Sequence, residues 1–94
     1  MYIQSDTVEW DSEKDQRNRA KHGVAFVDAV AVLEDDLALT ILDSISGSED
    51  RFVSIGSDVF GRVLVVVYTW RGSRARLISA RRATRRELHH YEED

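Results

Sequence analysis

Residues 61–87 read GRVLVVVYTWRGSRARLISARRATRRE, and this stretch decides the fold. Residues 62–71 are rich in β-branched and aromatic side chains, which is typical of a strand. A tight turn is expected at residues 72–73 (GS), with residues 76–82 as the second strand of a hairpin. Residues 84–87 (TRRE) form a capping box, which predicts that a helix begins directly after the hairpin.

The register of this hairpin decides which side chains stand together, because a one-residue slip moves them to the other face. A turn centred near residue 73 predicts four cross-strand pairs: Arg71 with Ala75, Thr69 with Leu77, Val67 with Ser79 and Val65 with Arg81. One face of the hairpin would then carry Thr69, Arg71, Ser79 and Arg81. The other face would carry Leu64, Val66, Tyr68, Trp70, Ile78 and Ala80.

The first quarter of the chain predicts a short strand and an unusual helix. Residues 7–10 (TVEW) read as the strand. A helix is expected at 12–22, with Ser12 as its N-cap and Gly23 at its C-terminal end. Ala20 is the only apolar residue of this helix. Because it has no apolar stripe of its own, we expect it to lie over the edge of another element.

The middle of the chain predicts a second helix and two further strands. Residues 25–35 carry apolar side chains at helical spacing, so this helix packs on the core. Residues 38–43 and 51–56 read as strands separated by the Ser- and Gly-rich segment 44–50. The sequence thus predicts one α+β domain over residues 1–94, with a mainly antiparallel sheet, two N-terminal helices and one C-terminal helix.

The charge of the chain is divided very unevenly along its length. The 94 residues include 17 Asp and Glu and 13 Lys and Arg, for a formal charge of −4. Residues 1–58 carry 13 acids and five bases, for −8; residues 59–86 carry eight Arg and no acid, for +8; residues 87–94 carry four acids, for −4. The absence of Cys excludes disulfides, thiol nucleophiles and Cys-based zinc sites, and fits a reducing cytoplasm. The longest apolar run has six residues, too few to span a membrane.

The basic segment is where phosphate chemistry is expected. Arginine donates bidentate hydrogen bonds to phosphate oxygens, and aromatic side chains stack on unpaired bases. The alternative is structural, since acids elsewhere in the chain can pair with these arginines. Arg85 and Arg86 favour the chemical explanation, because cations in the first turn of a helix oppose its dipole. Their structural explanation would be an acidic partner or the acidic tail at 92–94.

Lys21 and His22 end the first helix, where cations complement the helix dipole, so a structural role explains both. A chemical role is also open to them. Imidazole transfers protons near neutral pH, and an ammonium group can hold a developing oxyanion. His89 and His90 are neighbours on a helix and point about 100° apart. No metal-binding motif is present either, so we predict no metal site.

Seven motifs follow one another from about residue 8 to residue 92. They are VEWD (8–11), NxxKHGVxF (18–26), ExR (49–51), IG (55–56), GRVLVVVYTWR (61–71), LISARRATRRE (77–87) and YE (91–92). Together they resemble the family of BrnT toxins of bacterial BrnT/BrnA toxin–antitoxin pairs. The most specific part is ISARxATxxE behind VVYTxR.

The resemblance implies a compact RelE-like fold and a metal-independent endoribonuclease that cuts RNA and arrests translation and growth. It implies no cofactor, no membrane partner, and a BrnA-like antitoxin that silences the toxin and alone contacts operator DNA. A toxin homodimer within a toxin–antitoxin heterotetramer is compatible with it, because both faces of the hairpin are partly apolar and favour self-association.

The resemblance also suggests site residues, taken position by position from the matching motifs. The candidate catalytic residues are Lys21, His22, Arg51, Tyr68, Arg71 and Arg81. Further RNA contacts are expected at Arg62, Trp70, Arg76, Arg82 and Arg85.

Our hypothesis gives each catalytic candidate a role. His22 or Lys21 would transfer protons. Arg71 and Arg81 would stabilise the charge of the transition state. Arg51 would position the phosphate, and Tyr68 would stack on a base or support the site with a hydrogen bond.

Two other functions stay open at this point. One is a non-catalytic binding module of a repressor complex, whose Arg-rich face docks an acidic protein partner. The net charge of −4 favours it, because affinity for polyanions rests on clustered cations. The other is a toxin that has kept the fold and the partner but has lost cleavage.

Overall fold

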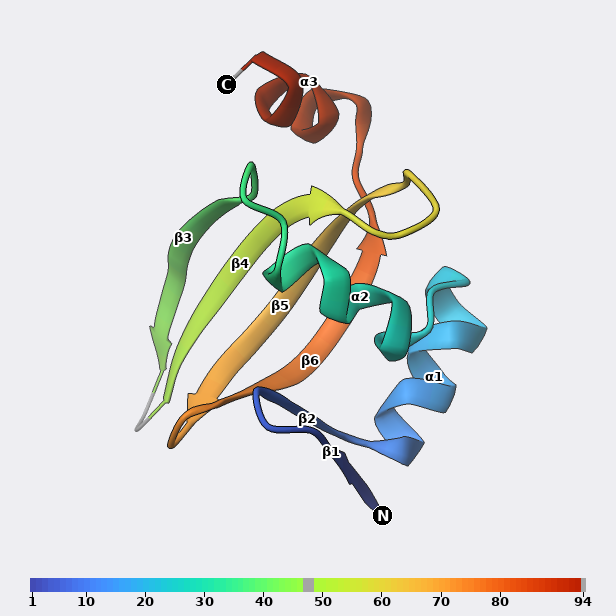
Figure 1. Ribbon diagram of the computed structural model, residues 1–94, viewed down its shortest axis with the longest axis vertical. Helices are drawn as coiled ribbons and strands as arrows, with labels where there is room; N and C mark the ends of the chain where they lie inside the picture. Colours follow the sequence, from blue (N-terminus) through green and yellow to red (C-terminus); the bar gives the residue numbers. More distant parts are fainter. Residues whose placement is uncertain (47–48, 94) are drawn as a thin grey trace.

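The computed structural model describes residues 1–46 and 49–93. Its elements, in chain order, are β1 (Tyr2–Gln4), β2 (Val8–Asp11), α1 (Ser12–His22), α2 (Phe26–Leu33), β3 (Leu39–Ser46), β4 (Glu49–Ser57), β5 (Val63–Arg71), β6 (Arg74–Arg82) and α3 (Arg85–Glu93). The six strands form one sheet in the order β1-β2-β6-β5-β4-β3. Helix α2 crosses one face of the sheet, α1 lies beside β6, and α3 stands at one end of the strands (Figure 1).

The strand directions confirm the α+β class with a mainly antiparallel sheet. Among the described residues, four of the five neighbouring strand pairs are antiparallel, and only β2 and β6 run parallel. Strand β1, whose three residues are all exposed, was not expected from the sequence. Strands β3 and β4 extend into the Ser- and Gly-rich segment 44–50 that was expected to separate them, and residues 47–48 of that segment lie outside the described residues. Within the described part of the chain, none of the helices has the length and apolar character needed to cross a membrane.

Helix α1 has the predicted length but a different N-cap. The cap is Asp11, whose backbone is extended and whose carboxylate accepts a hydrogen bond from the Glu13 N–H at 3.0 Å. Ser12, the predicted cap, is already the first helical residue. Gly23 ends the helix as predicted, with a left-handed φ of 71° that glycine adopts without steric cost.

The core lies between α2 and the sheet. Helix α2 buries Phe26, Ala29 and Val32, which are fully inaccessible to solvent. Their partners on the sheet include Leu64, Val66, Leu77 and Ala80. Burying a large apolar side chain contributes about 1.5–3 kcal/mol to stability, so this layer holds the two elements together. Apolar packing therefore determines which face of the sheet α2 covers.

The hairpin of β5 and β6 corrects the predicted register near its turn. The pairs Val65–Arg81 and Val67–Ser79 are confirmed. Closer to the turn the prediction is wrong, because Thr69 pairs with Arg76, not Leu77, and Arg71 pairs with Arg74, not Ala75. The physical reason is a turn of only two residues combined with a β-bulge that leaves Ile78 without a cross-strand partner. Leu77 consequently faces the core in place of Ile78.

The face of the sheet opposite α2 is called the open face below. Strand alternation and cross-strand pairing assign to it Arg51, Val53, Ile55, Val65, Val67, Thr69, Arg71, Arg74, Arg76, Ser79 and Arg81. It combines apolar side chains in the middle of the strands with arginines near their ends.

Candidate functional site

Helix α1 is bonded to the edge of β6 by one buried side chain. Strand β2 pairs with β6 only at Ala75 and Arg76, so the rest of this edge needs other partners. The Asn18 amide provides them: its Oδ1 accepts from the Ala80 N–H at 3.0 Å, and its Nδ2 donates to the Ala80 carbonyl at 2.7 Å. Nδ2 also donates to the Val24 carbonyl at 2.9 Å. Asn18 therefore takes the place of a neighbouring strand, which confirms that α1 lies over the edge of another element.

This attachment creates a basic groove between α1 and β6. Its volume is about 230 Å³, and it is lined by Lys14, Arg17, Asn18, Lys21, His22, Ile78 and Ser79. Among the described residues, none of those lining the groove is acidic. The groove thus joins both predicted residues of the KHG motif to the open face of the sheet.

Arg81 lies next to this groove and is held by an acid. It stands on the open face two residues after Ser79, which corresponds to about 7 Å along the strand. Its Nη1 and Nη2 donate to Glu87 Oε1 and Oε2 at 2.8 and 2.9 Å. The pKa of Glu87 is lowered to about 2, mainly by the hydrogen bonds from Arg81 and also by those from Thr84, and the contact with Glu87 raises the pKa of Arg81.

Glu87 connects this ion pair to the start of α3. Its Oε1 accepts from the Thr84 N–H at 2.9 Å, and its own N–H donates to Thr84 Oγ1 at 3.2 Å, so the predicted capping box is confirmed. The far end of α3 is anchored by Tyr91, whose hydroxyl donates to Asp35 Oδ2 at 2.6 Å. That hydrogen bond is the main cause of the lowered pKa of Asp35. Together these contacts fix α3 and Arg81 relative to the sheet.

Three other arginines of the basic segment are bonded inside the fold. Arg62 donates to Asp58 at 2.7 Å and lies 3.4 Å from Asp28. Arg76 donates to Glu9 at 2.6 and 2.8 Å, and Arg74 donates to the Ser5 carbonyl at 2.8 Å.

The pKa of Asp58 shows that the ion pair with Arg62 stabilises the charged carboxylate. Burial raises the pKa of Asp58, but hydrogen bonds from Arg62 and the Phe60 N–H outweigh it and leave the pKa below its ordinary value. Arg62 and Arg76, both expected to contact RNA, therefore sit in internal ion pairs. The sequence had left this structural alternative open.

The two predicted aromatic residues lie on the α2 side of the sheet. Tyr68 is only 5% exposed, stacks on Phe52 with ring centroids 5.9 Å apart, and its hydroxyl lies 3.0 Å from Ser54 Oγ. Such burial leaves no ring face for a base, whereas the hydroxyl already takes part in a hydrogen bond. Trp70 is 51% exposed and touches Tyr68 edge to face. Trp70 is thus the accessible ring of the two, on the face opposite Arg81.

Arg51 and Arg71 lie at the other end of the open face. Both are exposed. Arg71 is six residues along β5 from Val65, the partner of Arg81, which corresponds to about 20 Å. The predicted catalytic set therefore divides into Lys21, His22 and Arg81 near α1, Arg51 and Arg71 near the β5–β6 turn, and buried Tyr68.

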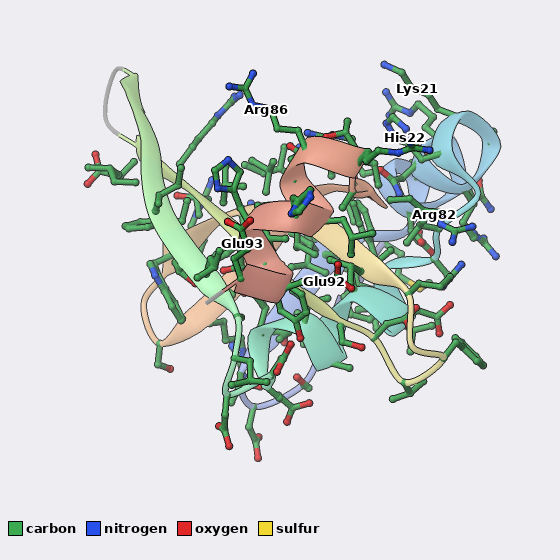
Figure 2. All side chains as sticks on the ribbon, turned by 90° about the horizontal axis from the view of Figure 1, so that it is seen from above. Lys21, His22, Arg82, Arg86, Glu92 and Glu93 are labelled. Carbon is green, nitrogen blue, oxygen red and sulfur yellow. The ribbon has the colours of Figure 1, made fainter. Side chains whose placement is uncertain are left out.

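Arg82, Arg85 and Arg86 are exposed, and in the described part of the chain no carboxylate forms an ion pair with them. Figure 2 shows Arg86 on the same side of the molecule as Lys21 and His22, while Glu92 and Glu93 point towards the other end of α3. Glu93 pairs with His89 at 3.2 Å. The described acids of the C-terminal tail therefore do not neutralise the arginines of the first turn, and Asp94 lies outside the described residues.

Sequence reasoning gave no role at the site to five residues that shape this region: Lys14, Arg17, Asn18, Ser79 and Glu87. A signal for Asn18 was present, because Lys21 and His22 follow it at i+3 and i+4 and share its side of the helix. The other signal was Glu87 of the capping box, which follows Arg81 by six residues. Nothing in the sequence indicated that its carboxylate would also hold that arginine.

Two comparisons with known proteins show the family and the fold of the chain. A family model described as "Ribonuclease toxin, BrnT, of type II toxin-antitoxin system" matches residues 10–87. The crystal structure of the Brucella abortus ribonuclease toxin BrnT is similar, with 29% sequence identity and a TM-score of 0.64. The match covers 84% of this chain and 96% of that chain. No protein with curated annotation matches the chain.

Proposed function

This chain belongs to the family of BrnT ribonuclease toxins of type II toxin–antitoxin systems, and we propose that it cleaves RNA internally without a metal ion. It acts in the cytoplasm and is neutralised there by a BrnA-like antitoxin. The observation that carries the proposal is the groove beside β6, where Lys21 and His22 of α1 stand next to Ser79, two residues from Arg81. A phosphate bound there can be reached both by a side chain that transfers a proton, Lys21 or His22, and by the charged side chain of Arg81.

The reaction begins with attack of the RNA 2′-oxygen on the adjacent phosphorus. His22 or Lys21 accepts the proton of the 2′-hydroxyl as the new P–O bond forms. The bond from phosphorus to the 5′-oxygen then breaks, and that oxygen takes a proton from the second of these groups or from water. The products are a 2′,3′-cyclic phosphate and a 5′-hydroxyl, so no water molecule is consumed in the cleavage step.

Arg81 stabilises the negative charge that grows on the phosphate oxygens. Glu87 and the Arg82 carbonyl accept from three of its five N–H donors, which leaves two for the phosphate. The bidentate contact with Glu87 holds the planar guanidinium in one orientation, and preorganisation of this kind is what makes a charge effective in a transition state.

The remaining candidates contact the substrate away from the reacting phosphate. Arg51 and Arg71 bind the backbone at the far end of the open face, because they lie too far from Arg81 to share one phosphate with it. Arg82 and Arg85 add contacts near α3, and Trp70 offers an exposed ring to a base. Tyr68 supports the sheet through its hydroxyl rather than by stacking.

The test is cleavage of RNA by the purified protein in the presence of EDTA. The wild-type protein is expected to give fragments that end in a 2′,3′-cyclic phosphate. Arg81→Gln should cleave about 10²–10³ times more slowly, the usual effect of removing one preorganised charge contact. Arg19→Gln is the matched control, since it makes the same charge change outside the groove and away from the β5–β6 hairpin.

The results of this assay distinguish an RNA-cleaving enzyme from a non-catalytic binding module. Folding of each variant is checked by circular dichroism, and a folded Arg81→Gln protein that cleaves like wild type would rule out the role of Arg81. If the wild-type protein itself gives no fragments but binds an acidic protein, the chain is a non-catalytic binding module. Loss of growth arrest in cells expressing Arg81→Gln provides an independent readout of the same assignment.

A further inference from the structure

The side of α1 that faces the groove carries more positive charge than the reaction requires. Lys14, Arg17 and Lys21 line it at spacings i, i+3 and i+7, so they share one side of the helix. Lys14 and Lys21 are separated by about 10 Å along the helix axis. A single phosphate cannot contact both ends of such a row, so the row suits an extended chain of phosphates.

Helix stability explains Lys21, whose charge in the last turn of α1 complements the helix dipole, but it does not explain Lys14 or Arg17. Lys14 lies in the first turn of α1, where a positive charge opposes the helix dipole. Arg17 is 3.7 Å from Glu13, but both side chains are about three-quarters exposed, at 74% and 75%, and such pairs contribute little. Within the described residues, no ion pair involves Lys14 or Lys21. The three cations therefore remain available to an external anion.

The opposite wall of the groove comes from the bulge in β6. Ile78 has no cross-strand partner and lines the groove beside Ser79, in place of facing the core. Bulges commonly redirect a side chain next to a functional site. The groove thus offers an apolar surface and a hydroxyl opposite a row of cations, which fits the ribose and phosphate of one strand.

We infer that the α1–β6 groove is a backbone-binding site for unpaired RNA, in which Lys14 and Arg17 hold phosphates next to the one that is cleaved. This inference rests on the proposed function, because it extends the same groove away from His22. Its volume of about 230 Å³ is below the roughly 300–1,000 Å³ of small-molecule pockets, which fits the backbone of one strand better than the width of a duplex. Proteins that bind duplex RNA instead span its surface by shape over many base pairs.

The experiment measures RNA binding without cleavage. The probe is a fluorescent single-stranded 2′-O-methyl oligonucleotide of about 12 nucleotides, which lacks the attacking hydroxyl. Its affinity is followed by anisotropy over a series of NaCl concentrations. Each phosphate contact adds about 0.7 to the slope of log affinity against log salt for a single strand. Lys14→Gln and Arg17→Gln are each expected to lower the slope by about that amount.

Arg19→Gln is the matched control, because it makes the same charge change on the same helix outside the groove. Its slope should equal that of the wild-type protein. Equal slopes for Arg17→Gln and Arg19→Gln would overturn the inference. So would a 2′-O-methyl duplex that binds as tightly as the single strand and responds equally to Arg17→Gln.

Cleavage of unmodified RNA separates this inference from the proposed function. Arg17→Gln should raise KM and leave kcat unchanged, as expected for a contact made equally in the ground state and the transition state. If wild type cleaves RNA but Arg17→Gln and Arg19→Gln have the same KM, only the inference fails. If wild type cleaves nothing, the proposed function fails whatever the salt slopes are.

Discussion

Replacing Asn18 by alanine should destabilise the protein more than any surface change on α1. The side chain is 6% exposed and makes three hydrogen bonds, to the Ala80 N–H, the Ala80 carbonyl and the Val24 carbonyl. Asn18→Ala leaves all three backbone groups without that partner. An unpaired buried polar group costs about 1–3 kcal/mol. At the lower value, which allows for water entering the vacated space, the loss is about 3 kcal/mol.

That loss is large for a chain of this size. At about 0.05–0.15 kcal/mol per residue, 94 residues give a free energy of unfolding of roughly 5–14 kcal/mol. A domain of this length loses about 4–8 °C in Tm per kcal/mol, so Tm should fall by about 12–24 °C. The groove depends on the same side chain, and cleavage by Asn18→Ala should therefore fall even at temperatures where the protein is folded.

The assay is urea denaturation followed by circular dichroism, with Tm from a thermal scan. Gln16→Ala is the control, because it removes an amide from an exposed position of the same helix and should change stability by less than about 0.5 kcal/mol. If Asn18→Ala unfolds with a free energy within about 1 kcal/mol of wild type, the amide does not hold α1 on β6, and our account of the groove is wrong.

Three further changes test other contacts. Glu87 has a folded pKa of about 2 against an ordinary value of 4.5, so its pairing with Arg81 stabilises the protein above pH 4.5 and is lost as the pH falls towards 2. Because Arg81 is 39% exposed and solvent weakens the pair, we expect a loss of about 1–2 kcal/mol. Urea denaturation should show Glu87→Gln less stable than wild type at neutral pH and equally stable near pH 2; a constant difference would contradict the assignment. Tyr91→Phe removes the donor to the Asp35 carboxylate and should lower the free energy of unfolding by about 1.5 kcal/mol, as measured in a thermal scan. Hydrogen exchange in α3 should also become faster. Unchanged exchange would show that this contact does not anchor the helix. Gly23→Ala should lower the free energy of unfolding by about 1–2 kcal/mol. The cause is the φ of 71° alone, since no atom lies within 4 Å of the added Cβ. An unchanged Tm would argue against the left-handed cap.

The order and type of most elements could be predicted because local signals determine them. The capping box at Thr84 and the left-handed glycine at Gly23 act within a few residues, and both are confirmed. The missing apolar stripe of α1 correctly predicted that this helix lies at an edge. It could not identify the edge, because the partner Ala80 lies 62 residues away in the sequence.

The hairpin shows why the register of two paired strands is harder to predict than the type and order of the elements. A single unpaired residue at Ile78 and a two-residue turn compensate for each other, so the far pairs of the prediction were right and the near pairs were wrong. Alternation along the strand is equally compatible with either arrangement near the turn. Only packing of Leu77 against the core distinguishes them.

The roles of the arginines were the least predictable part of the site. Arg62, Arg76 and Arg81 look equivalent in sequence, and each meets an acid in the structure. Glu9 lies 67 residues from Arg76, so the pairing is a property of the sheet order and not of local sequence. The high density of Arg in this segment thus serves the fold as well as any ligand, which composition alone could not reveal.

The amide of Asn18 also limits how one molecule can join another. An unpaired strand at a sheet edge is a template on which a strand of a second chain can add, and such addition leads to swapped dimers or aggregates. At Ala80 both backbone groups are already bonded to Asn18, so no incoming strand can pair there. Of the two outer strands among the described residues, β1 has three residues and β3 has eight. Any continuous sheet formed between two molecules would therefore have to be built mainly along β3.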